Sequence, residues 1–147
     1  MSGVSDKPRV VIDTQLFLRA AINLRSLPAK LILEMVDRYD LIMSLPIADE
    51  IKDVLNRPTI RAKFPDLSDE VVNRIIVRLE DAEWVLLPDV PAVGRDPKDD
   101  IFLATAVNGE AHYIASEDKD LLVLNPYKGI QIVNALKFLE VLRGGEE

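Results

Sequence analysis

Short runs of apolar residues alternate with longer amphipathic segments along this chain. Five runs are rich in β-branched and other apolar side chains and predict buried strands: residues 9–13, 40–44, 83–87, 112–115 and 129–133. Apolar residues at helical spacing predict helices between and after these strands, over residues 15–22, 28–38, 46–55, 68–79, 96–108 and 134–142. Strands that alternate with helices and lack a polar face are typical of a parallel sheet covered on both sides. The pattern therefore predicts an α/β fold, with Trp84 of the third strand in the core.

Length and composition limit the organisation and chemistry of the chain. Its 147 residues suit one domain, and we expect residues 1–8 and 143–147 to be frayed tails. The absence of cysteine excludes disulfides, thiolate zinc sites and a cysteine nucleophile, and a single histidine, His112, excludes a multi-histidine metal cage within one chain. A Ser-His-Asp site would depend on that one histidine. Neither a signal peptide nor a run of about 20 apolar residues is visible, so we expect a cytoplasmic protein outside the membrane.

The charge of the chain restricts how it could bind nucleic acid. A formal net charge of −7 disfavours broad attraction to nucleic acid or anionic lipid. RNA binding would therefore depend on a local basic patch or on bound cations. Arg57, Arg61 and Lys63 follow the helix that carries Glu50. They could line a path for a phosphate backbone or could form an ordinary solvated helix end.

Acidic residues lie just beyond the predicted strands. Asp13 ends the first strand, Glu50 lies on the helix after the second, and Asp118 follows the fourth; Asp99 and Asp100 begin the helix before the fourth strand. Ligands of open parallel sheets bind beyond the carboxyl ends of the strands, where the strand order reverses. Clustered carboxylates repel one another without a counter-ion, and their oxygens suit Mg²⁺ or Mn²⁺. The sequence therefore predicts a site for divalent metal ions.

Each acid also has an ordinary structural explanation. Glu50 could belong to a solvated helix face, and Asp118 could form a turn. Asp99 lies at the third position of its predicted helix, where a negative charge interacts favourably with the helix dipole. Asp100 shares a face with Leu103, which turns inward, so an acid there is harder to explain by structure alone. Taken together, the strand-end positions favour a site over separate structural roles.

Four segments of the chain resemble the PIN domain family. They are Val10–Thr14, the helix from Glu50 to Pro58, Asp96–Ala104 and Ser116–Leu122. The resemblance extends from Arg9 to about Leu142 and is strongest to the VapC-like branch, the toxin components of prokaryotic toxin–antitoxin pairs. It implies a metal-dependent ribonuclease with a three-layer α/β/α sandwich around a five-stranded parallel sheet.

The resemblance also implies roles for individual residues. Asp13, Asp100 and Asp118 would hold Mg²⁺ or Mn²⁺, and Glu50 would complete an acidic quartet directly or through water. Asp100 is preferred because its spacing to Asp118 fits the family pattern, which leaves Asp99 as a possible outer-shell contributor. Water would attack the phosphodiester in line and leave a 5′-phosphate. RNA, a cognate antitoxin and a second copy of the chain are the expected partners, the last through a Leu- and Val-rich surface on the short helices after the first strand.

Two positions near the acids complete the comparison with the family pattern. Ser116 occupies the place of a small hydroxyl residue two positions before the last acid. Gln15 replaces the Asn that usually follows Asp-Thr and orients the acids. This departure favours an alternative, a catalytically weak PIN-fold module that binds RNA or protein. A phosphatase-type site would need Asp at position 15, and a receiver domain would need an acidic pair at the end of the first strand; this chain has neither.

Overall fold

The computed structural model describes residues 7–88, 90, 92 and 96–144. The two predicted tails, residues 1–8 and 143–147, lie partly outside these residues. At the carboxyl end, the last helix continues through Arg143 to Gly144, into the segment expected to fray.

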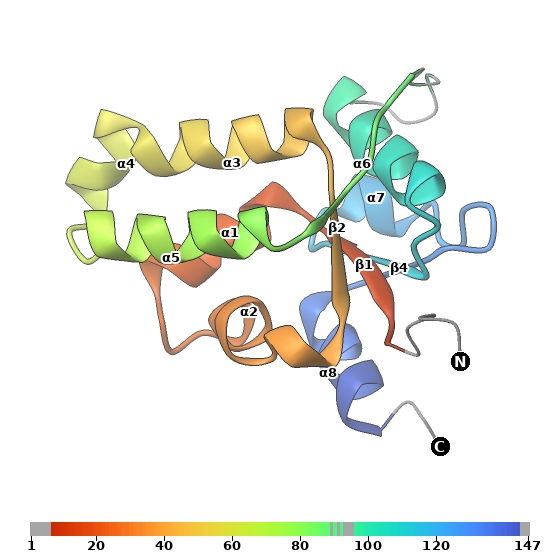
Figure 1. Ribbon diagram of the computed structural model, residues 1–147, viewed down its shortest axis with the longest axis horizontal. Coiled ribbons are helices and arrows are strands. Elements are labelled where there is room, and N and C mark those ends of the chain that lie inside the picture. Colours follow the sequence, from red (N-terminus) through yellow and green to blue (C-terminus); the bar gives the residue numbers. More distant parts are fainter. Residues whose placement is uncertain (1–6, 89, 91, 93–95, 145–147) are drawn as a thin grey trace.

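A five-stranded, all-parallel sheet forms the centre of the structure (Figure 1). Its strands are β1 (Arg9–Ile12), β2 (Asp40–Met43), β3 (Glu83–Trp84), β4 (Tyr113–Ala115) and β5 (Gln131–Val133). Their order is β3-β2-β1-β4-β5, so the chain builds outward from β1 first on one side and then on the other. The strand order therefore reverses between β1 and β4, and the predicted fold class is confirmed.

Helices cover the sheet from both sides. Figure 1 shows α6 and α7 on one side of the central strands and α2 and α8 on the other. The helical segments are α1 (Thr14–Ile22), α2 (Leu27–Ala29), the π-helical η1 (Lys30–Glu34), the 3₁₀-helical η2 (Val36–Arg38), α3 (Leu45–Asn56), α4 (Pro58–Lys63), α5 (Asp69–Glu80), α6 (Pro97–Asn108), α7 (Lys119–Leu122) and α8 (Ala135–Gly144). None of these described helices is long and apolar enough to cross a membrane.

Acidic and hydroxyl side chains fix where several helices begin. Asp13, Asp96 and Asp118 each accept a hydrogen bond from the backbone N–H two residues later, at the starts of α1, α6 and α7. Ser68 accepts one from Val71 at the start of α5. Such caps satisfy N–H groups that have no partner inside the helix. Two predicted site acids, Asp13 and Asp118, therefore also define the local fold.

The predictions around β3 and the second helix need correction. Strand β3 spans only two residues, and Trp84 is 44% exposed, so its predicted place in the core is wrong. The physical reason is that β3 is an edge strand, which pairs with β2 alone. The helix predicted over residues 28–38 is divided into α2, η1 and η2. Apolar spacing predicted which side of this segment is buried but could not predict the change in helix type.

Candidate active site

A pocket of about 330 Å³ opens at the point where the strand order reverses. Ligand sites of open α/β sheets occur at this position because the loops after neighbouring strands diverge there. The pocket collects side chains from α1, α3, α6 and the segment after β4. Its lining residues are Asp13, Thr14, Gln15, Arg19, Glu50, Asp96, Lys98, Asp99, Phe102, Glu117 and Asp118.

Asp13 is held on both of its carboxylate oxygens. Oδ1 accepts a hydrogen bond from the Gln15 backbone N–H at 3.1 Å, and Oδ2 accepts one from the Ser116 hydroxyl at 2.7 Å. Ser116 is fully buried, and its oxygen also accepts the backbone N–H of Asp118 at 2.9 Å. Burial raises the pKa of the Asp13 carboxyl above its usual value, while these two hydrogen bonds lower it. Ser116 thus fixes the position of Asp13 relative to the segment that carries Asp118.

Asp99 is the acid whose surroundings are least favourable to its charge. Asp99 is 3% exposed, and its Oδ2 atom has no hydrogen-bond partner among the described residues. Burial, followed by the negative charges of Asp118 and Asp96, raises the pKa of Asp99 to about 6. A buried carboxylate without a partner is costly unless a cation or proton compensates it. Asp99 is therefore the strongest indication that the pocket is built to receive positive charge.

The residues that line the pocket include Asp99 but not Asp100, the acid preferred on family spacing. Asp100 is buried, but it is absent from the residues that line the pocket. Asp99 shares its face with Phe102, three residues later, which also lines the pocket. Because α6 is buried around much of its circumference and offers no single inward face, local spacing alone does not distinguish Asp99 from Asp100.

Glu50 reaches the pocket from α3 and is held by two neighbours. Its Oε1 atom accepts a hydrogen bond from the Thr14 hydroxyl at 3.0 Å, and its Oε2 atom lies 3.0 Å from the Lys98 ammonium. The hydrogen bond to Glu50 raises the pKa of Lys98, so the lysine stays charged. The structure therefore brings together Asp13, Glu50 and Asp118, as predicted, with Asp99 as the fourth acid.

The basic residues at the pocket differ from those that the sequence suggested. Arg57 pairs with Asp53 at 2.8 Å and Arg61 pairs with Asp69 at 2.9 Å, and neither lines the pocket. Arg19 and Lys98 line it instead. Arg19 lies four residues after Gln15 on the same face of α1, a spacing that could have identified it.

The donor atoms around the pocket suit a hard divalent cation. Asp13, Asp99 and Asp118 offer carboxylate oxygens, which Mg²⁺ and Mn²⁺ prefer, and Asp99 has an oxygen without a partner. Over the described part of the chain, no three acidic or imidazole side chains converge closely enough to enclose an ion. The residues present therefore fit such an ion in the chemistry of their donor atoms.

Comparison with known proteins decides the family. A family model described as PIN domain matches residues 9–120. The chain belongs to the PIN domain family. PIN domains are generally nucleases, and they typically bind divalent metals. The matched segment contains all of the acids that line the pocket of this PIN domain.

A solved structure shares the same fold. The crystal structure of PAE2754 from Pyrobaculum aerophilum matches with a TM-score of 0.59 and 15% sequence identity, over 92% of this chain and 89% of that chain. At this identity the match supports the fold alone. No curated protein matches the chain.

Replacing Asp99 by Asn should stabilise the metal-free PIN domain at neutral pH. The folded pKa of about 6 lies above the ordinary 3.8, so the folded state binds this proton more tightly than the unfolded state does. Stability should then fall as pH rises through this window, by at most about 3 kcal/mol for Asp99. Urea unfolding with a chelator present, at pH about 4 and about 7, should show a smaller decline in Asp99→Asn than in wild type. The exposed acid Asp66 provides a control, Asp66→Asn, and equal declines in all three proteins would contradict the prediction.

Replacing Ser116 by Ala should loosen the connection between the two strand ends. The variant leaves the Asp13 Oδ2 atom and the Asp118 backbone N–H without their present partner. Loss of buried hydrogen bonds of this kind costs about 1–3 kcal/mol of unfolding free energy. The pKa of Asp13 should also rise further, because the lost hydrogen bond favours the charged form. Thermal unfolding and carboxyl NMR titration would measure both effects, and unchanged values would show that Ser116 has no such role.

Proposed function

We propose that this PIN domain is an Mg²⁺- or Mn²⁺-dependent endoribonuclease and the toxin component of a toxin–antitoxin pair. The observation that carries the proposal is the buried, unpartnered Asp99 oxygen beside Asp13 and Asp118, in the pocket at the switch point of the sheet. The family supports a nuclease, and the all-carboxylate donor set supports divalent metal. The toxin role and the RNA substrate follow the sequence resemblance.

In this proposal, Asp13, Asp99 and Asp118 hold the metal, and Glu50 acts directly or through water. A divalent ion in such a site supplies an activated water and stabilises charge on the phosphodiester. Ser116 orients Asp13, as the Thr14 hydroxyl orients Glu50. Arg19 and Lys98 place positive charge at the pocket, where an anionic phosphate would approach. Cleavage would leave a 5′-phosphate.

Single substitutions should distinguish the proposed metal ligands from the neighbouring acid Asp100. Asp13→Asn and Asp99→Asn should each lower Mn²⁺-dependent cleavage of a single-stranded RNA by about 100-fold or more, above the cost usual for outer-shell changes. Asp100→Asn should retain most activity, because Asp100 does not line the pocket. Gel assays with end-labelled RNA, with and without a chelator, would measure these rates.

The same assay tests the competing assignments. Loss of cleavage in Asp100→Asn with activity retained in Asp99→Asn would restore the assignment from family spacing. Cleavage that survives both Asp13→Asn and Asp99→Asn would contradict a nuclease centred on this pocket. RNA binding without cleavage by the folded wild type would favour the binding-module alternative that Gln15 suggests.

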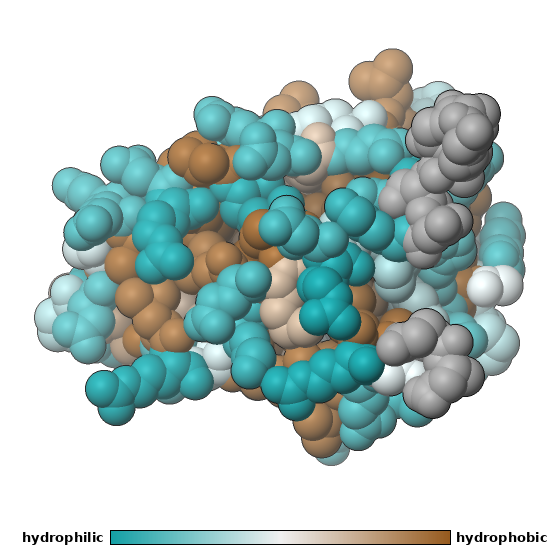
Figure 2. Space-filling view, turned by 60° about the horizontal axis from the view of Figure 1, so that its bottom comes forward, coloured by the Kyte–Doolittle hydropathy of each residue, from teal (hydrophilic) through white to brown (hydrophobic). Residues whose placement is uncertain are grey.

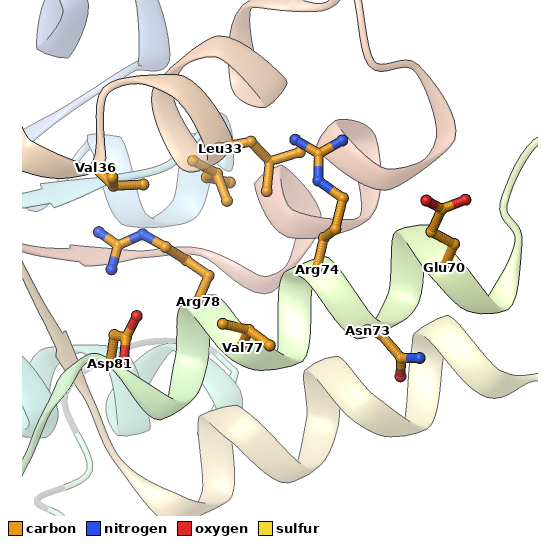
Figure 3. Close-up of a pocket in the computed structure, with 9 residues that line it drawn as sticks. Leu33, Val36, Glu70, Asn73, Arg74, Val77, Arg78 and Asp81 are labelled. Carbon is orange, nitrogen blue, oxygen red and sulfur yellow. The ribbon is translucent and has the colours of Figure 1, made fainter.

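A second hollow, the apolar groove, supplies a surface for the proposed homodimer. This groove of about 700 Å³ runs between η1 and α5 and is lined by Ile32, Leu33, Val36, Glu70, Asn73, Arg74, Val77, Arg78 and Asp81. Figure 3 shows the two arginines reaching from α5 toward the side of Leu33 and Val36. Figure 2, which brings the lower side of Figure 1 forward, shows apolar surface between hydrophilic side chains. Partly exposed apolar residues between charged ones suit a protein interface, and we assign the groove to a second copy of the chain.

A charge placed in the apolar groove should prevent dimer formation without affecting the pocket. Val77 is 55% exposed and lines the groove, so Val77→Glu should be tolerated by the monomer. Sedimentation analysis should find a dimer for wild type and a monomer for Val77→Glu. Val123→Glu, at a 77% exposed position on another surface, is the matched control and should remain dimeric. A wild type that is monomeric at high concentration would contradict the proposed dimer. The cognate antitoxin would then be the occupant of the groove to test.

A further inference from the structure

Lys98 is the cation that contacts the acidic pocket most directly. Its ammonium lies 3.0 Å from Glu50 Oε2, while the Thr14 hydroxyl occupies Oε1 of the same carboxylate. Glu50 therefore has a partner on each oxygen, in contrast to Asp99, whose Oδ2 atom has none. The positive charge in the pocket is thus placed on a half-buried acid rather than on Asp99, the most buried one.

The start of α6 fixes the position of the Lys98 backbone. Lys98 is the second residue of α6, and its backbone N–H donates to Asp96 Oδ1 at 2.9 Å. The next residue is Asp99, which faces the pocket. The lysine side chain also lines the pocket and reaches Glu50 on α3. The ion pair joins two elements that approach the pocket from different parts of the chain.

Breaking the ion pair between Lys98 and Glu50 costs little free energy. The Lys98 side chain is 65% exposed and that of Glu50 is 24% exposed. Ion pairs at exposed sites contribute about 0.2–1 kcal/mol, and a lysine stem can redirect its ammonium with little loss of packing. A divalent cation carries twice the charge and can be shared among several carboxylates. It would therefore displace the ammonium from Glu50.

The charges around Lys98 determine where the displaced ammonium would go. Asp96 and Asp99 from α6, Asp13 after β1 and Asp118 after β4 face the same pocket, with Arg19 from α1. Once these acids share a metal ion, they no longer attract the lysine as strongly. A phosphate of a nucleic-acid strand entering the pocket is then the nearest strong acceptor, because Lys98 remains at the pocket wall.

We propose that Lys98 is a built-in counter-ion that neutralises Glu50 in the metal-free chain and turns to a substrate phosphate once a divalent ion takes Glu50. Lys98 is thus a positioning residue that couples metal loading to strand binding. This inference rests on the proposed nuclease function. It assigns one lysine two successive partners, so its removal should affect metal binding and substrate binding in opposite directions.

The decisive experiment compares Lys98→Met with a matched lysine elsewhere. Calorimetry would measure Mn²⁺ affinity, and cleavage of a single-stranded RNA would give KM and kcat. Lys98→Met should bind Mn²⁺ about 1.5- to 5-fold more tightly, which corresponds to the loss of an exposed ion pair. Its KM should rise several-fold with kcat little changed. Lys98→Arg, which keeps a phosphate-binding charge, should retain the wild-type KM.

Lys137→Met provides the control. Lys137 lies 3.9 Å from Glu140 on α8, with both side chains 60% exposed, and does not line the pocket. It should leave Mn²⁺ affinity and KM unchanged, and melting temperatures would confirm that every variant is folded. A folded Lys98→Met that binds Mn²⁺ no more tightly than wild type would overturn the counter-ion role while leaving the nuclease intact. A wild type that binds no Mn²⁺ would overturn both proposals.

Discussion

The hydrogen bonds of Ser116 join the two strand ends between which the pocket is built. Strands β1 and β4 lie side by side, and the chain leaves them toward opposite parts of the fold. The Asp13 backbone N–H still donates to the Ala115 carbonyl at 3.0 Å, and beyond this bond the two segments diverge and create space. The Ser116 hydroxyl connects them, because it donates to Asp13 and accepts from the Asp118 backbone. The acids contributed by α3 and α6 are arranged around that connection.

The pocket opposes stability because it concentrates negative charge in a partly dry space. Asp13 and Asp99 are both nearly fully buried, and burial raises the pKa of each. In a fold selected only for stability, these positions would favour neutral residues. The unfavourable arrangement makes sense if a cation binds there, since the same repulsion that destabilises the metal-free chain then contributes to affinity. The Lys98 ion pair is a partial and reversible relief of this repulsion.

Sequence periodicity predicted the sheet well because each central strand is buried on both faces and reads as a continuous apolar run. It failed at Trp84, because an edge strand is half-exposed and the apolar pattern of a strand does not show whether the strand lies at the edge of the sheet. It could not choose between Asp99 and Asp100, because α6 is buried on several sides and a local spacing cannot tell the pocket side from the sheet side. Lys98 was missed because its importance depends on Glu50, which α3 brings near it and which no local pattern contains. Arg19 could have been found from its spacing to Gln15 on α1.

Because Asp13 and Asp118 cap helices, the effect of their charge can be tested apart from their structural role. Asp13 and Asp118 each accept a backbone N–H at a helix start, and Asn performs this role about as well as Asp. Replacement by Asn therefore removes the charge while it preserves the cap. Asp99 lies in the first turn of α6, where its charge interacts favourably with the helix dipole, but its buried Oδ2 atom has no hydrogen-bond partner among the described residues. The acid that is hardest to justify structurally is thus the one whose charge is best explained by function.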